Sequence, residues 1–254
     1  MALARADLES LLRTRRLDRT LTTAERPAER DPIYDVSATG ATALDARLGG
    51  GFPRGQLSEI VGPRSSARAS LMVQMLSAAT ARGELVALVD ALDMLDVESA
   101  GAAGVDLDRL LWIRGHVVMN PGMCRDMNQR ALEQAIRAFA LVLQAGNFGL
   151  VVFDAGEAPA DAIRRLPFTT WLRLQRMVEG SPTACVLVGA QPMARSSSGL
   201  TVQCGVTGDR GTKGIRFGSQ LFDGLDVEAR VVSARMQRSQ ETRDVRVPLS
   251  TVAS

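Results

Sequence analysis

The sequence predicts an α/β protein whose central sheet is mostly parallel. Short apolar runs of four to six residues alternate with longer segments that have helical periodicity. Parallel strands must be joined by long crossovers, usually helices, so this alternation favours βαβ units. Near the C-terminus the pattern changes to two segments in which apolar and polar residues alternate, as in strands. These segments predict antiparallel strands at one edge of the sheet.

Strands and helices are expected to follow one another from residue 56 onward. The predicted strands are apolar runs rich in valine and leucine, at residues 56–61, 85–89, 110–113, 150–153 and 185–188. The predicted helices occupy residues 70–82, 125–145 and 160–178. Gly83 and Gly146 follow the first two, as glycine commonly follows a helix C-terminus.

The chain after residue 190 has a different character. Residues 192–218 contain many glycines and serines and predict a long loop or an irregular hairpin, which is often a mobile or binding element. The two edge strands are expected at residues 226–235 and 242–247.

The N-terminal residues predict a separate element. Leu8, Leu11 and Leu12 recur near helical spacing among arginines, which indicates an amphipathic helix within residues 1–30. A linker with Pro27 and Pro32 follows, so we divide the chain into residues 1–35 and residues 36–254. The leucine stripe needs a surface to cover it. It either mediates self-association or folds back onto its own domain.

Composition excludes several classes of protein. With 254 residues and 46% hydrophobic content, the chain is long enough for one globular α/β domain and an appendage. It has no apolar run of about 18 residues and no signal peptide, so we expect a cytoplasmic protein without a membrane span. Cys124, Cys185 and Cys204 are odd in number and widely spaced, which argues against disulfides or a zinc site.

Residues 62–69 occupy the place of a phosphate-binding loop, directly after a predicted strand and before a predicted helix. The working pattern, G-x-x-x-x-G-K-[ST], needs a second glycine for the turn, a lysine for the phosphates and a hydroxyl for magnesium. Those three positions hold Ala67, Arg68 and Ala69. The residues of this candidate loop are Gly62, Ser65, Ser66, Ala67, Arg68, Ala69 and Ser70.

Each of the three replacements weakens phosphate binding. Arg68 has a broad planar head where the loop suits a slim stem that ends in a point charge. Ala67 places a methyl group where the turn needs a positive φ, which costs about 1 kcal/mol or more. Ser70 carries a hydroxyl, but it is displaced along the helix by one residue from the magnesium position.

Several motifs in the correct order resemble the RecA recombinase family. They are Thr39-Gly40, Leu44-Asp45, the glycine turn Gly49-Gly50-Gly51, Pro53-Arg54-Gly55, and then the strand and loop described above. The similarity continues through Asp90, Leu95, Asp96 and Gly104-Val105-Asp106, and it covers about residues 36–190. The resemblance implies a RecA-like core with a mostly parallel sheet, to which the N-terminal helix and the C-terminal edge strands are added.

The departures from the family pattern concern ATP hydrolysis. In RecA-like ATPases a glutamate after the second strand positions the attacking water, and the matching residue here is Leu92. Asp93 and Glu98 lie nearby, but a shift along the chain changes the face on which a side chain points. The family's magnesium-associated aspartate is retained as Asp154. The resemblance therefore implies a degenerate ATP site, no catalysis and no cofactor.

With a RecA-like core and a degenerate ATP site, the chain also resembles the ImuA family of bacterial mutasome proteins. This resemblance implies a non-catalytic protein that contacts an ImuB-like protein and RecA in the SOS response and translesion mutagenesis. The alternative is a DNA-dependent ATPase or recombinase with an atypical nucleotide site that uses Arg68, Ser70 and Asp154. Ala69 and Leu92 favour the first interpretation.

Direct binding to DNA is a further hypothesis. The candidate contacts, near the places where recombinases hold their DNA loops, are Arg164, Arg165, Arg195, Arg210 and Lys213. Clustered cations suffice for weak binding to phosphates, but the same residues fit a solvated face in a protein whose cations are almost all arginine. Few aromatic residues are present for base stacking. His116, the only histidine, predicts neither a ligand nor a base, and Trp112 and Trp171 are expected to pack in the core or an interface.

Overall fold

The computed structural model describes residues 36–116, 125–156, 158–194, 199–205, 215–216, 224–234 and 245–250. All of them belong to the larger of two compact units, Pro32–Ser254, and the smaller unit is Met1–Asp31. The predicted N-terminal helix with Leu8, Leu11 and Leu12 therefore lies outside the described residues, and its boundary at residue 35 stays a prediction. Arg195, Arg210 and Lys213 also lie outside them.

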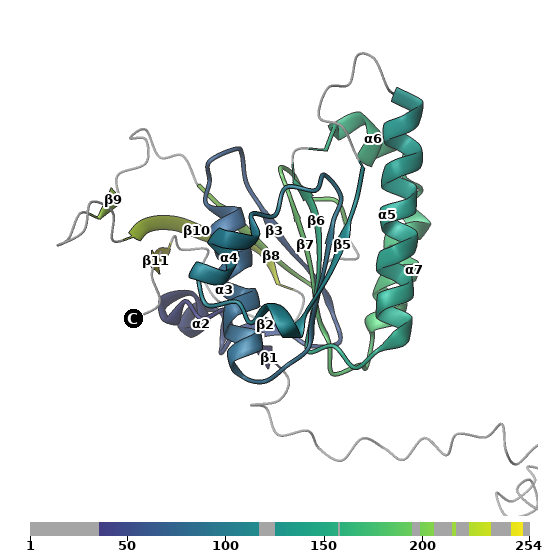
Figure 1. The fold of residues 1–254 in the computed structure, drawn as a ribbon. Helices are drawn as coiled ribbons and strands as arrows, with labels where there is room; N and C mark the ends of the chain where they lie inside the picture. The colour runs from purple at the N-terminus through teal and green to yellow at the C-terminus, as the bar shows by residue number, and fades with distance from the viewer. Residues whose placement is uncertain are drawn as a thin grey trace, which may run out of the picture. The chain divides into compact units, whose positions relative to one another are not determined.

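A nine-stranded sheet forms the centre of the described residues (Figure 1). Six neighbouring strands are parallel, in the order β8 (Leu200–Cys204), β3 (Leu57–Val61), β7 (Ala184–Gly189), β6 (Leu150–Gly156), β4 (Val86–Asp90) and β5 (Leu110–Arg114). β10 (Gly224–Ala234) pairs antiparallel with β8, and β11 (Val245–Ser250) and β9 (Ile215–Arg216) pair antiparallel with β10. The prediction of a mostly parallel sheet with antiparallel edge strands is confirmed. A separate small sheet pairs β1 (Val36–Ser37) with β2 (Phe52–Pro53).

Helices cover both faces of the large sheet (Figure 1). On one face lie α2 (Thr42–Leu48), α3 (Arg68–Ala81) and α4 (Val97–Ala102). On the other lie α5 (Arg125–Ala145), α6 (Ala160–Arg165) and α7 (Phe168–Val178). None of the helices in the described part of the chain is long and apolar enough to span a membrane.

The central strands β4, β6 and β7 are almost entirely apolar, and most of their residues are buried because both faces of the sheet are covered. In β4, Val86 and Leu88 belong to the core beneath α3, whereas Ala87 and Val89 belong to the core beneath α5. Successive side chains of a strand point to opposite faces, so a run without polar alternation fits a sheet that is covered on both sides. This two-sided burial explains why the short apolar runs predicted the parallel strands.

Two local expectations are wrong. The predicted helix over residues 160–178 is two helices, since Pro167 lacks an N–H and disfavours a helical conformation at Leu166, which has φ −63° and ψ 130°. The loop predicted over residues 192–218 contains β8, which pairs in parallel with β3 inside the sheet. Thr201 of β8 is buried although its side chain is polar.

Candidate functional site

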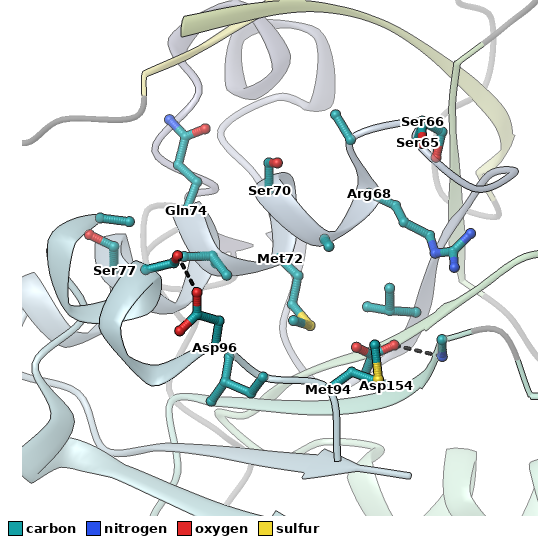
Figure 2. Close-up of a pocket in the computed structure, with 18 of the residues that line it drawn as sticks. Ser65, Ser66, Arg68, Ser70, Met72, Gln74, Ser77, Met94, Asp96 and Asp154 are labelled. Atoms are coloured by element: carbon teal, nitrogen blue, oxygen red, sulfur yellow. Dashed lines mark hydrogen bonds between the residues drawn. The ribbon is translucent and has the colours of Figure 1, made fainter. Parts of the chain in front are cut away.

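The loop of residues 62–67 leaves the carboxyl end of β3 and leads into the first turn of α3. A pocket of about 880 Å³ opens beside it, between α3 and α4 (Figure 2). In open parallel sheets, ligand sites lie beyond the carboxyl ends of the strands. The sequence-predicted residues that line this pocket are Ser65, Ser66, Ala67, Arg68, Ala69, Ser70, Leu92 and Asp154. Gly62 lies in the same loop, so the structure brings the candidate loop, Leu92 and Asp154 together.

The backbone of the loop adopts the tight turns that the motif requires. Ser65 has φ 61° and Ala67 has φ 62°, both in the left-handed region that favours glycine. For Ala67 this conformation costs about 1 kcal/mol or more relative to glycine. The sequence therefore correctly indicated a positive φ at Ala67, and the turn forms there despite the methyl group.

Strand β8 supports the loop from behind. A Cβ added to Gly62 would lie 2.7 Å from the carbonyl oxygen of Cys204. A Cβ added to Gly205 would lie 2.8 Å from the Cβ of Ser66. The Gly62 N–H also donates to the carbonyl oxygen of Gly189 at 3.1 Å. Glycine is required at position 62 because the loop and β8 approach too closely for any side chain.

Arg68 turns back into its own loop. Its side chain is buried, at 8% exposure for the residue, and Nη1 donates a hydrogen bond to the carbonyl oxygen of Gly62. In Figure 2 the side chain extends from the first turn of α3 beneath the stretch that carries Ser65 and Ser66. The guanidinium thus lies within the loop and is held there by the residue at which the loop begins. Burial of a charged group is tolerated only where such hydrogen bonds compensate it.

Leu92 and Asp154 both line the pocket, and both side chains lie near Gly156. The Cδ1 atom of Leu92 lies 3.2 Å from the position that a Cβ on Gly156 would occupy. Asp154 lies two residues before Gly156 in the same strand, and its Oδ1 accepts the Gly156 N–H at 2.7 Å (Figure 2). An apolar side chain therefore lies near Asp154 at the position where the resemblance led us to expect a glutamate.

The carboxylates near Leu92 in the sequence are engaged elsewhere. Asp93 forms two short contacts with Arg114, at 2.6 and 2.7 Å, and hydrogen bonding to this guanidinium holds the pKa of Asp93 below its usual value. Arg114 also stacks over the ring of Trp112, 4.8 Å from its centroid. Neither Asp93 nor Glu98 lines the pocket. Asp96 does, but it caps α4, and its hydrogen bond with Ser99 lowers its pKa.

The cysteines near the site are not nucleophiles. Burial raises the pKa of Cys204 to about 12, although the charge of Arg68 acts in the opposite direction. Burial also raises the pKa of Cys185 far above its usual value. A thiol with a raised pKa remains protonated and inert at neutral pH. Within the described ranges, no group of three or more His, Cys, Asp or Glu side chains is placed to hold a metal ion.

The two candidate DNA contacts within the described residues, Arg164 and Arg165, do not line the pocket. Arg164 and Arg165 are exposed on α6, in the helical layer on the opposite face of the sheet from α3. Arg165 pairs with Asp161 at 2.6 Å. Trp171 is buried in the core beneath α5, as predicted for a packing residue, and His116 is exposed beyond the end of β5.

Sequence reasoning missed one buried carboxylate, Glu59, which is 1% exposed in the middle of β3. Its Oε1 accepts the backbone N–H groups of Met193 and Ala194, at 2.6 and 2.8 Å, and its Oε2 accepts the Thr201 hydroxyl at 3.3 Å. Glu59 therefore fixes the segment between β7 and β8. The only signal in the sequence was a single charged residue inside a short, mostly apolar run.

Comparisons with known proteins match the N-terminal part of the chain. Residues 26–159 match the family model described as RecA N-terminal domain. Protein RecA from Clavibacter michiganensis subsp. michiganensis is 39% identical over 128 residues, which cover 50% of this chain and 31% of the relative. Protein RecA from Streptomyces avermitilis is 38% identical over 132 residues, which cover 52% of this chain and 30% of the relative. The match thus spans about a third of the length of these curated relatives.

Proposed function

Because the chain belongs to the RecA N-terminal domain family, we propose that it is a RecA-like protein of the DNA-damage response that acts through protein contacts and not through ATP hydrolysis. The observation that carries this proposal is the hydrogen bond from Arg68 to the Gly62 carbonyl oxygen. It places a buried guanidinium inside the loop that holds phosphates in proteins with the complete motif.

Binding of a nucleotide would have to displace this contact. A hydrogen bond to a charged group contributes about 1.5–3 kcal/mol, and a guanidinium that leaves the loop must find new partners. The exposed Ala69 has no hydroxyl for magnesium, and the Ser66 hydroxyl is buried in the loop. These features together support weak or absent binding of ATP.

Hydrolysis has a second obstacle at Leu92. Phosphoryl transfer depends on positioning of the attacking group and on stabilisation of charge. The leucine side chain neither accepts a proton nor orients water, and the nearest carboxylate in the sequence, Asp93, pairs with Arg114. Leu92 therefore supports a protein that does not turn over ATP efficiently.

The resemblance to the ImuA family supplies the proposed partners. A RecA-like core that does not use ATP is suited to a scaffold role, in which the family fold is kept for its surfaces. We therefore assign the protein to SOS-induced translesion mutagenesis, with an ImuB-like protein and RecA as its partners.

The rival function is a DNA-dependent ATPase with an atypical site, and one observation favours it: Ser70 and Asp154 line the same pocket as Arg68. Isothermal titration calorimetry with ATP and magnesium, with and without single-stranded DNA, separates the two. We expect no binding heat and no DNA-stimulated phosphate release, together with capture of purified RecA by the immobilised protein. Stoichiometric ATP binding followed by DNA-dependent release of phosphate would establish the rival.

A further inference from the structure

The helical layer formed by α5, α6 and α7 carries an uncompensated positive charge. Five exposed arginines of this layer make no ion pair with any described residue: Arg130, Arg137, Arg164, Arg173 and Arg176. α5 and α7 lie next to each other over the sheet, and α6 adjoins α5 (Figure 1). The arginines therefore belong to one face of the protein, opposite the face that holds the pocket.

Elsewhere in the described residues, four arginines form ion pairs with carboxylates. Arg54 and Arg82 both pair with Glu84, Arg109 pairs with Asp106, and Arg114 pairs with Asp93. The five unpaired arginines of α5–α7 thus lie in one helical layer, whereas four of the arginines elsewhere in the described residues are held in ion pairs.

Acidic residues within the layer do not balance these charges. Asp161 is paired with Arg165, and Glu133 accepts a hydrogen bond from Gln129 at 3.1 Å. Asp126 and Glu179 are exposed near the ends of α5 and α7 and form no ion pair with the described arginines. The hydrogen bond from Gln129 leaves the negative charge of Glu133 in place, but Asp126, Glu133 and Glu179 are fewer than the five unpaired arginines, so the layer keeps an excess of positive charge.

The outward face of α5 has the spacing of a helix-packing seam. Exposed side chains recur at intervals of three and four residues: Met127, Arg130, Gln134, Arg137, Leu141 and Gln144. Met127 and Leu141 are each 65% exposed and lie on either side of the two arginines. Intervals of three and four residues place side chains in one stripe on a helix, which is the arrangement that packs against a second helix. This seam thus has a basic centre with an apolar residue toward each end.

We propose that the outward face of α5, supported by the arginines of α7, docks an acidic amphipathic helix of a partner protein. The proposal rests on the proposed function in protein contacts, because it names the surface and the chemistry of one contact. Glutamate or aspartate at the centre of the partner helix would pair with Arg130 and Arg137. Apolar residues toward its ends would cover Met127 and Leu141.

A protein helix fits this face better than nucleic acid does. Phosphates would satisfy the arginines, but they would leave Met127 and Leu141 exposed to water. The aromatic residues Phe139 and Trp171 of these helices are buried, and Phe168 is half-buried, so none is exposed as a platform for bases.

The test uses the full-length protein and a fluorescein-labelled synthetic helical peptide of the length of α5. The peptide has leucine at both ends and glutamate at two central seam positions, and a peptide of scrambled sequence is its control. Fluorescence anisotropy is measured at about 0.1 M ionic strength, at which exposed charges still interact over about 10 Å. We expect saturable binding of the designed peptide and none of the scrambled peptide.

Variants locate the binding site. Arg130→Glu with Arg137→Glu is expected to weaken binding at least about tenfold, and a peptide with lysine in place of glutamate should then bind this double variant better than the wild type. Arg64→Glu is the matched control, because Arg64 is also exposed and forms no described ion pair but lies beside the pocket. If the charge-reversed protein does not fold, Arg130→Gln with Arg137→Gln is used, and the expected loss of affinity is smaller.

Three results would overturn the proposal. The first is failure of the designed peptide to bind, and the second is equal affinity of the peptide for the wild-type protein and a folded double variant. The third is that a duplex or single-stranded oligonucleotide binds the wild-type protein more tightly than the peptide does, and that the double variant loses this binding. The last result would assign the face to nucleic acid. None of these results bears on ATP binding or on RecA capture, so failure here is distinguishable from failure of the proposed function.

Discussion

The guanidinium of Arg68 donates a hydrogen bond to the carbonyl oxygen of Gly62, six residues earlier in the chain. Arg68 is the first residue of α3, and Gly62 is the first residue after β3. The hydrogen bond therefore connects the two ends of the loop. In a working phosphate loop the backbone N–H groups point at a bound anion. Here a cation of the chain itself donates to the first residue of the loop.

Restoration of the motif should recover binding without catalysis. The triple variant Ala67→Gly, Arg68→Lys, Ala69→Thr supplies the glycine, the lysine and the hydroxyl that the pattern requires. We expect a rise in melting temperature of the variant with ATP and magnesium, because a ligand that binds only the folded state stabilises it. ATP turnover should remain at the background level, since Leu92 still occupies the position of the water-positioning group.

The wild-type protein is the control, and its melting temperature should not change with ATP. Robust turnover by the triple variant would contradict our interpretation of Leu92 and would point to Asp93 as the base. Addition of Asp93→Asn to the triple variant would then test that assignment, because it removes the carboxylate and keeps the shape of the side chain.

Ala67→Gly alone should stabilise the protein by about 0.5–1 kcal/mol, because Ala67 holds φ 62° and glycine adopts this conformation without strain. The measurement is urea unfolding followed by circular dichroism. Ala69→Gly is the matched control: it deletes the same methyl group inside α3, where glycine destabilises a helix by up to about 1 kcal/mol. Destabilisation of similar size in both variants would show that the strain at Ala67 is offset by its packing.

The sequence predicted those parts of the fold in which one local pattern dominates. The apolar run of residues 57–61 and the loop motif after it identified β3, the loop and the start of α3, and the helix predicted at 125–145 has the observed bounds. In contrast, β8 contains Thr201 and Gln203, which give it the appearance of a loop. It is a strand because β3 and β10 pair with it on both sides, and such long-range pairing leaves little trace in a local window.

The sequence predicted which residues lie at the candidate site, but not which hydrogen bonds they form. Motif spacing placed Arg68, Leu92 and Asp154 around one loop, and the pocket contains all three. The inward turn of Arg68 depends on a side-chain rotamer and on the proximity of the Gly62 carbonyl group, which no spacing specifies. The role of Glu59 depends on a segment more than 130 residues later in the chain.

Deletion of residues 1–30 should leave a folded domain and weaken self-association or RecA binding. The reason is the stripe of Leu8, Leu11 and Leu12, which is apolar and needs a covering surface. Light scattering gives the mass of the full-length and truncated proteins, and a pull-down gives the capture of RecA. Unchanged mass and unchanged capture would exclude a role of this segment between molecules, and a lower melting temperature in that case would assign the stripe to its own chain.

Loss of the Glu59 carboxylate should destabilise the protein strongly. Glu59→Ala leaves the buried N–H groups of Met193 and Ala194 without their acceptor, and each unsatisfied group costs about 1–3 kcal/mol. Glu59→Gln keeps one oxygen that accepts both groups, and its amide can donate to the Thr201 hydroxyl oxygen, so we expect a loss of about 1.5 kcal/mol or less. Chemical unfolding of both variants gives the difference, with Glu98→Ala as the control at an exposed glutamate. If Glu59→Ala and Glu98→Ala lost equally little stability, the two N–H groups would have other acceptors, and Glu59 would not fix the segment between β7 and β8.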